Sequence, residues 1–175
     1  MDKELKSWIS TFKDCTLDSF RQDQTSPFEQ ISYDEGQDMD KFYSLYKPAL
    51  SYSPDSMQFI DLYSAGLSLE KKGKKIIAAA DVDMAVTLCN LKDKKWMRIA
   101  SFGPSANIEE AVWISGSRFI LAGTLQGDSG EVLPIILVGD TGSQSFRWFQ
   151  AKCIRPSEKE YQASGLVKLK IDEWE

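Results

Sequence analysis

The sequence predicts an α+β protein, mostly β, with an N-terminal helical segment and two similar antiparallel sheets. Apolar residues recur at helical spacing within the first 50 positions. From about position 57 onward, short strand-like runs alternate with turns rich in Gly, Asp and Asn. One order of features also occurs twice, in 52–99 and in 113–149: an aromatic residue, a polar turn, two strands, a tight turn and an aromatic-rich strand. This recurrence predicts two sheets built on one plan.

Length, composition and charge limit the classes of function. A chain of 175 residues, 42% apolar and 27% charged, suits one globular domain. The net charge of −5 argues against nucleic acid as the partner, because phosphates attract a basic face. We find no apolar run of about 18 residues and no signal peptide. The sequence as given therefore predicts a cytoplasmic protein without a membrane span. A periplasmic or lipid-anchored protein is the alternative if a signal segment was removed.

The chain has three cysteines, Cys15, Cys89 and Cys153. Because this number is odd, they cannot all pair in disulfides. Cys89 lies in an apolar strand-like run, where a free cysteine behaves as a small hydrophobic residue. This set fits a reducing compartment or an incidental role better than a disulfide framework.

The N-terminal segment, 1–50, is predicted to be helical and to pack on the sheets. In 2–14, an i, i+3, i+4, i+7 stripe indicates an amphipathic helix, which we expect to be docked because helices this short are marginal alone in water. The stripe consists of Leu5, Trp8, Ile9 and Phe12. Residues 16–36 are polar and are expected to form a loop. A second helix is predicted over 38–46, ended by Pro48.

The remainder, 51–175, is predicted to be a β domain of two repeats, 51–102 and 109–151, and a C-terminal strand at 164–171. The first repeat is expected to be interrupted by an extra hairpin over about 65–83, with the lysine-rich run 71–75 as its solvated tip. The hairpin strands are expected at 67–71 and 75–81. The other strands of the two repeats are expected at 57–63, 84–90, 95–101, 109–114, 118–125, 133–139 and 145–151.

Two turn motifs carry a family resemblance. Ser53-Pro54-Asp55-Ser56 and Asp140-Thr141-Gly142 resemble the Ser-Pro-Asp-Gly and Asp-x-x-Thr-Gly turns of blades in the periplasmic β-propeller of the Tol system and in related peptidase propellers. The resemblance covers about 50–151 and implies two propeller-blade-like antiparallel sheets. A closed propeller needs at least four blades, so we expect two isolated blade-like sheets. A larger propeller built from two chains is the alternative.

The string Gly127-Asp128-Ser129-Gly130 resembles the nucleophile motif of chymotrypsin-like proteases, which need a histidine base. The chain has no histidine. We therefore expect Ser129 to be an exposed turn residue, and we expect no catalytic residues. Asp81 and Asp83 could share a cation if they project from one side of a strand. A solvated strand end is the simpler interpretation, and we expect no cofactor and no metal.

Aromatic residues near 146–149 suggest a binding surface. Strand alternation places Phe146 and Trp148 on one face and Arg147 and Phe149 on the other, so some aromatic area is expected to be exposed. We therefore take Arg147, Trp148 and Phe149 as a possible contact site, although placement of these aromatic residues in the core is the favoured interpretation. The function this predicts is non-catalytic binding or scaffolding with a protein or peptide partner. The alternatives are an immunity or inhibitor protein, and a metal-dependent hydrolase or transferase that uses paired carboxylates. The sequence does not define the oligomeric state.

Overall fold

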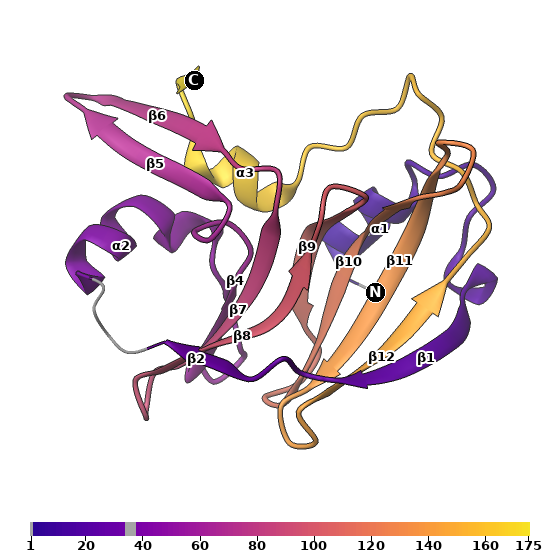
Figure 1. Cartoon of the computed structure of the whole chain (residues 1–175), viewed down its shortest axis with the longest axis horizontal. Helices are drawn as coiled ribbons and strands as arrows, with labels where there is room; N and C mark the ends of the chain where they lie inside the picture. Colours follow the sequence, from indigo (N-terminus) through magenta and orange to yellow (C-terminus); the bar gives the residue numbers. More distant parts are fainter. Residues whose placement is uncertain (1, 34–37) are drawn as a thin grey trace. The chain divides into compact units, whose positions relative to one another are not determined.

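The computed structural model of the chain describes residues 2–33 and 38–175 and is mostly β, which confirms the predicted fold class (Figure 1). The chain divides into two compact units. The first unit comprises 1–28 and 105–162, and the second comprises 29–104 and 163–175. The structure therefore divides the predicted N-terminal segment, 1–50, between the two units.

The first unit contains a five-stranded antiparallel sheet, here called the first sheet, with strand order β1-β12-β11-β10-β9. Its elements are α1 (Lys3–Ile9), η1 (Leu17–Ser19), β1 (Arg21–Pro27), β9 (Ala106–Trp113), β10 (Arg118–Gln126), β11 (Val132–Asp140) and β12 (Ser145–Gln150).

The second unit contains another five-stranded antiparallel sheet, the second sheet, with order β2-β8-β7-β4-β3, and a small sheet of order β13-β6-β5. Its elements are β2 (Ile31–Tyr33), α2 (Met39–Tyr46), η2 (Lys47–Ala49), β3 (Ser51–Tyr52), β4 (Gln58–Asp61), β5 (Leu67–Lys72), β6 (Lys75–Ala80), β7 (Met84–Asn90), β8 (Lys95–Phe102), α3 (Ser164–Leu169) and β13 (Glu173–Trp174).

The two large sheets have the same strand order. Going across each sheet, β1, β12, β11, β10 and β9 correspond to β2, β8, β7, β4 and β3. The strands that follow the two polar turns, β4 and β10, therefore hold the same place, as the sequence predicted. The hairpin β5–β6 interrupts the second sheet's sequence, as predicted. It belongs to a separate small sheet together with β13, which the sequence did not predict.

Each large sheet also carries the same cluster of three aromatic rings. In both, a phenylalanine on the inner strand contacts an aromatic residue of the edge strand and another of the strand two places away (5.2–6.0 Å between ring centroids). The clusters are Tyr52, Phe59 and Trp96 in the second sheet, and Trp113, Phe119 and Phe146 in the first. Gly139 lies between the last two rings, where a Cβ atom would come within 2.2 Å of the Phe119 ring.

The hairpin turns after these clusters match in detail. Asp140 Oδ1 accepts hydrogen bonds from the backbone N–H groups of Gly142 and Ser143 at 2.8 and 3.2 Å. Asn90 caps its own turn in the same way, at 3.0 and 3.2 Å. Both turns close with a residue at φ 49°, Gln144 and Lys94 respectively. A short polar side chain that caps turn amides is thus the shared device.

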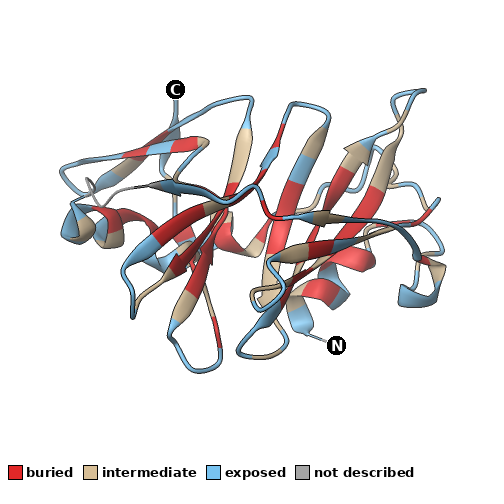
Figure 2. Cartoon of the chain, turned by 60° about the horizontal axis from the view of Figure 1, so that its bottom comes forward, coloured by how far each residue is buried: buried red, intermediate tan, exposed pale blue. Residues whose placement is uncertain are grey.

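In the first unit, α1 is docked on the first sheet, and the prediction of a docked N-terminal helix is confirmed. All four residues of its predicted stripe are buried, and Trp8 is only 1% exposed (Figure 2). They pack with Ala122 and Ile136 of the sheet. The helix ends at Ile9, earlier than predicted, and Phe12 follows in the turn beyond it.

A buried ion pair ties the segments of the first unit together. A bulge in β9 makes Glu109 an extra residue opposite β10, so that it is buried together with its neighbour Glu110. Arg155 donates two hydrogen bonds of 2.7 Å to the Glu109 carboxylate, and Trp8 Nε1 donates a third. Tyr161 donates to Glu110 at 2.7 Å. Burial and this hydrogen bond raise the pKa of Tyr161.

The structure pairs Cys15 with Cys153 in a disulfide across 138 positions, whereas the sequence favoured an absence of disulfides. That prediction is wrong. Spacing alone does not reveal that the segment after α1 lies beside the segment after β12, where the Lys13 N–H bonds to the Ile154 carbonyl. Cys89 is free and buried, as predicted.

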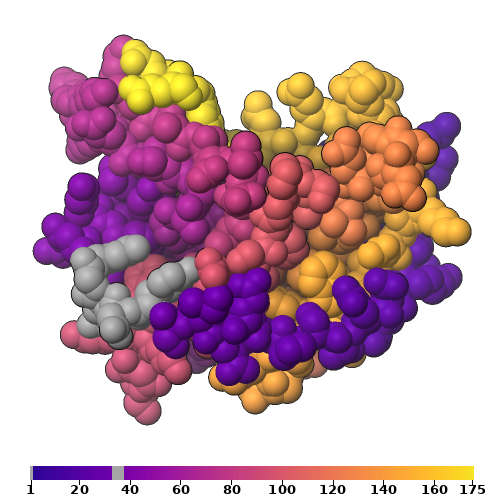
Figure 3. Space-filling model, viewed as in Figure 1, coloured from indigo at the N-terminus to yellow at the C-terminus, as the bar shows by residue number. Residues whose placement is uncertain are grey.

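Two secondary-structure predictions are also wrong. The predicted loop 16–36 contains β1 and β2, and its positions 34–36 lie outside the described residues. Because β1 is a polar edge strand exposed along nearly its whole length, it lacks the apolar alternation that marks a strand (Figure 3). The predicted strand 164–171 is helix α3. Its Gly165 lies against Tyr63, where a Cβ atom would come within 2.4 Å of the ring.

Among the described helices, none is long and apolar enough to cross a membrane.

Candidate functional site

One row of cross-strand neighbours differs in chemistry between the two large sheets. In the second sheet, two residues along from the aromatic cluster, Thr87 pairs with Asp61 on one side and with Arg98 on the other. The corresponding row of the first sheet is Leu121, Leu137 and Trp148. Leu121 and Leu137 are fully buried. A polar row thus occupies the place of an apolar one.

A bulge widens this polar row. Thr87 pairs with Arg98, whereas Val86 pairs with Ala100, so Ile99 is an extra residue of β8. An extra residue shifts the alternation of side chains, which places Arg98 and Ser101 on the same face. Glu29 Oε2 contacts both of them: it lies 3.1 Å from Arg98 Nε and accepts a hydrogen bond of 3.0 Å from Ser101 Oγ.

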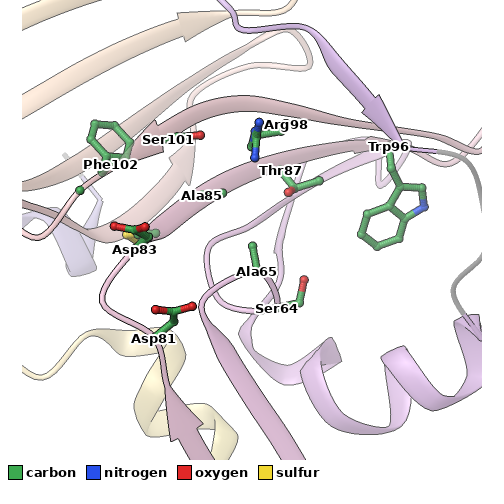
Figure 4. Close-up of a pocket in the computed structure, with 12 residues that line it drawn as sticks. Ser64, Ala65, Asp81, Asp83, Ala85, Thr87, Trp96, Arg98, Ser101 and Phe102 are labelled. Carbon is green, nitrogen blue, oxygen red and sulfur yellow. The ribbon is translucent and has the colours of Figure 1, made fainter.

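This face of the second sheet is only half covered. Helix α2 packs Phe42 onto Phe59 and Trp96, with ring centroids 6.3 and 4.9 Å apart. Beyond the helix the face opens into a cleft of about 560 Å³ (Figure 4). The cleft is lined by Ser64, Ala65, Asp81, Asp83, Met84, Ala85, Thr87, Trp96, Arg98, Ser101, Phe102 and Gly103.

The inserted hairpin supplies one wall of the cleft. Its return segment contains both Asp81 and Asp83, which are exposed. Gly66 allows this segment to come close, since a Cβ atom there would lie 2.6 Å from the Asp83 carbonyl oxygen. The Asp81 N–H donates to the Gly66 carbonyl at 2.8 Å. In Figure 4, Asp83 and Phe102 lie toward one end of the cleft, Trp96 lies toward the other, and Arg98 stands between.

The cleft has a negative balance of charge. The carboxylates of Asp81 and Asp83 belong to its lining, and Glu29 lies directly behind Arg98, the single cation among the lining residues. A second, shallower groove of about 410 Å³ shares Ser64, Ala65 and Asp81 with the cleft. The acidic wall therefore faces two adjoining hollows.

Asp61 lies buried at the edge of the polar row. Its carboxylate accepts hydrogen bonds from the Tyr63 and Ser64 N–H groups at 2.9 and 3.2 Å, and from Ser64 Oγ. Burial raises the pKa of Asp61, although these hydrogen bonds act in the opposite direction. Asp61 thus fixes the turn that presents Ser64 to the cleft.

The structure brings the predicted pair Asp81 and Asp83 to one cleft without a third acid among the lining residues. Within 2–33 and 38–175, no group of three or more His, Cys, Asp or Glu side chains is placed to hold a metal ion. Ser129 lies in an exposed turn, as predicted, and its N–H donates to Glu131 Oε2 at 3.1 Å.

The predicted contact site on β12 is divided between environments. Arg147 is exposed, whereas Trp148 is half-buried and donates from Nε1 to Ser26 Oγ at 2.8 Å. Phe149 points to the other face and packs against the cluster around α1. The three residues do not form one continuous aromatic surface.

The first unit has a hollow of its own, of about 450 Å³, beside α1. Nine of its ten lining residues are apolar: Leu5, Trp8, Ile9, Leu17, Val112, Trp113, Ile114, Ile120 and Ile136, with Asp2 as the tenth. The two units therefore offer hollows of opposite character.

Sequence reasoning missed Thr87, Arg98 and Glu29. A signal was present, because aligning the two predicted repeats on their aromatic residues sets Thr87 against Leu137. Glu29 carries no such signal, since its role depends on the position of β2.

No protein-family model, curated protein or solved structure matches the chain.

Proposed function

We propose that the protein is a non-catalytic binding protein that holds a positively charged segment of a partner protein in the cleft of the second unit. The carrying observation is the polar row Asp61, Thr87 and Arg98, which replaces the apolar row of the matched sheet and of which Thr87 and Arg98 line a cleft. Apolar residues there would strengthen the core. Their replacement by polar residues therefore favours a role in recognition.

The charge of the cleft favours a cationic ligand. Asp81 and Asp83 are exposed on its wall, while Glu29 already offsets the charge of Arg98. The whole chain is acidic as well, with a net charge of −5. Complementary charge speeds encounter and selects partners more than it adds affinity. A lysine- or arginine-bearing segment satisfies this field.

The size of the site favours a peptide over a simple ion. A cleft of about 560 Å³ lies within the range of roughly 300–1,000 Å³ typical of ligand sites. The adjoining groove extends it along the hairpin. An immunity or inhibitor role is one form of this proposal, in which the partner is a basic protein. The Cys15–Cys153 disulfide favours an oxidising compartment, where such bonds persist.

The test uses the blocked peptides acetyl-trilysine-amide and acetyl-triglutamate-amide, with binding followed by NMR of the backbone amides. We expect only trilysine to shift amides of the cleft, at residues 81–87 and 98–103. Each exposed ion pair contributes about 0.2–1 kcal/mol, so the double variant Asp81→Asn/Asp83→Asn should bind several-fold more weakly.

Asp128→Asn is the matched control, because Asp128 is an exposed acid of the first unit. It should bind as the wild type does. Trilysine shifts spread evenly over the surface, or full binding by the double variant, would contradict the proposal.

A further inference from the structure

The Arg98 side chain lies between Glu29 and the cleft. Its Nε atom is shielded from solvent and lies 3.1 Å from Glu29 Oε2. The side chain as a whole is nevertheless 33% exposed and lines the cleft. Within the described part of the chain, its two Nη groups make no hydrogen bond. The guanidinium therefore lines the cleft, and no described residue forms a hydrogen bond with its Nη groups.

This geometry suits a carboxylate ligand. The guanidinium is a planar fork whose N–H groups match the two oxygens of a carboxylate. Glu29 Oε2 accepts a hydrogen bond from Ser101 Oγ and lies 3.1 Å from Arg98 Nε as an ion pair, without a hydrogen bond between them. This ion pair restrains the fork, and a restrained fork loses less conformational entropy when an anion binds.

The acidic wall lies within reach of the same ligand. Arg98 is the cross-strand neighbour of Thr87, and Asp83 precedes Thr87 by four residues. Asp83 and Arg98 both line the same cleft, so one ligand can contact both side chains.

We infer that the segment bound is a free C-terminus whose last residue is lysine or arginine. Its α-carboxylate binds the Nη groups of Arg98, and its side-chain cation lies between Asp81 and Asp83. Such a residue pairs every exposed charge of the cleft, whereas an internal lysine leaves Arg98 without an anion. This inference rests on the function proposed above and names the ligand of that same site.

Three matched peptides test it by calorimetry. Acetyl-Gly-Ser-Gly-Lys carries both charges, its C-terminal amide lacks the carboxylate, and acetyl-Gly-Ser-Gly-norleucine lacks the ammonium but keeps a four-carbon chain. We expect the lysine acid to bind at least about tenfold more tightly than the amide, because charge-assisted hydrogen bonds to arginine are strong. The norleucine acid should also bind more weakly than the lysine acid.

Variants assign each preference to its residue. Arg98→Gln should abolish the difference between the lysine acid and its amide, and Arg98→Lys should retain part of it as a point charge without a fork. Asp81→Asn/Asp83→Asn should abolish the difference between lysine and norleucine. Asp128→Asn should change neither, and melting curves should show that each variant is folded.

The outcomes separate the two proposals. Equal binding of the acid and the amide, with loss of both in Asp81→Asn/Asp83→Asn, overturns the C-terminal inference and leaves the binding of cationic segments intact. Equal weakening of both peptides by Arg98→Gln and by Arg98→Lys also overturns it, since Arg98 would then act only on the structure of the site. Failure of these peptides and of trilysine to bind overturns both proposals.

Discussion

The two large sheets share strand order, aromatic clusters and turn chemistry, yet their helices cover opposite faces. In the second sheet, α2 packs on the face that carries Phe59 and Trp96. In the first sheet, α1 packs on the face of Ile120 and Val138. These are strand neighbours of Phe119 and Gly139, so they point away from the aromatic cluster. The same order of strand pairing therefore occurs with a helix packed on one face in one sheet and on the opposite face in the other.

This difference shows that strand order fixes the positions of the strands but does not determine where a cleft forms. The site depends on the residues of one row and on how far the helix reaches. Helix α2 covers the aromatic end of its face, and beyond it Thr87 and Arg98 line the cleft, although Thr87 and Asp61 are themselves buried. In the first unit a disulfide and a buried ion pair fasten the covering segments. Cross-links therefore fasten the segments that cover the first sheet, whereas a cleft borders the second sheet.

The largest expected effect comes from unfastening α1. Trp8→Ala removes a side chain that is 1% exposed and bonded to Glu109, so unfolding should become easier by about 3–5 kcal/mol. Urea unfolding followed by circular dichroism measures the change. Trp174→Ala is the matched control, because Trp174 is 57% exposed and should cost little. An unchanged curve for Trp8→Ala would show that α1 does not close the first sheet.

The disulfide offers a second way to loosen the first unit. Cys15→Ser/Cys153→Ser should lower stability by about 2–4 kcal/mol, because the bond restricts a long loop in the unfolded chain. Reductant should lower the melting temperature of the wild type and leave that of the double variant unchanged. A thiol assay in denaturant should find one free thiol before reduction and three after it. Three thiols before reduction would refute the bond.

Much of this frame was predictable from the sequence, because it depends on local signals. The Asn90 and Asp140 turns, the aromatic residues and the inserted hairpin are each set by neighbours in the chain. The edge strand β1 was missed because it is polar, and β2 because it has only three residues; both gain their bonds from strands far along the chain, β12 and β8. The internal duplication and the Tol-type resemblance stay predictions.

The candidate site was less predictable. Asp81 and Asp83 were noticed for their spacing, but the cleft arises from the approach of their segment to Gly66 and from the bulge at Ile99. Both are properties of pairing register, which a single sequence does not reveal. The Arg155–Glu109 pair was missed for the same reason, since 46 positions separate its partners.

Exchanging residues between the matched rows tests the comparison itself. Leu137→Thr puts a hydroxyl into a fully buried position and should cost roughly 2–4 kcal/mol. Thr87→Leu should cost less than about 1 kcal/mol, because Thr87, although buried, lines the cleft, so that a leucine adds apolar area without leaving a hydroxyl unpaired. Denaturant unfolding of the two variants measures both. Equal costs would mean that the rows are not distinguished by closure, and the polar row would lose its meaning as a mark of function.

The smallest expected effect is a dependence on pH at Asp61. Because burial raises the pKa of Asp61, the folded protein holds this proton more tightly than the unfolded chain, whose aspartate titrates near 3.8. The stability that this proton provides is complete below that value and is lost as the pH rises through the folded-state pKa. Asp61→Asn keeps an oxygen that accepts the Tyr63 and Ser64 N–H groups and removes the titration.

The wild type should therefore lose stability relative to Asp61→Asn as the pH rises above 3.8, by at most about 1.4 kcal/mol per pH unit because one proton is involved. Urea unfolding of both proteins between pH 3 and 8, roughly the window in which a carboxyl of raised pKa titrates, measures the difference. Asp128→Asn, an exposed acid, should run parallel to the wild type. A wild type that gains relative stability with rising pH would show that the three hydrogen bonds outweigh burial. Asp61 would then be an ionised support of the Ser64 turn. Leu121, the fully buried counterpart of Asp61 in the first sheet, has no ionisable group. A pH dependence of stability from this position therefore occurs only in the polar row.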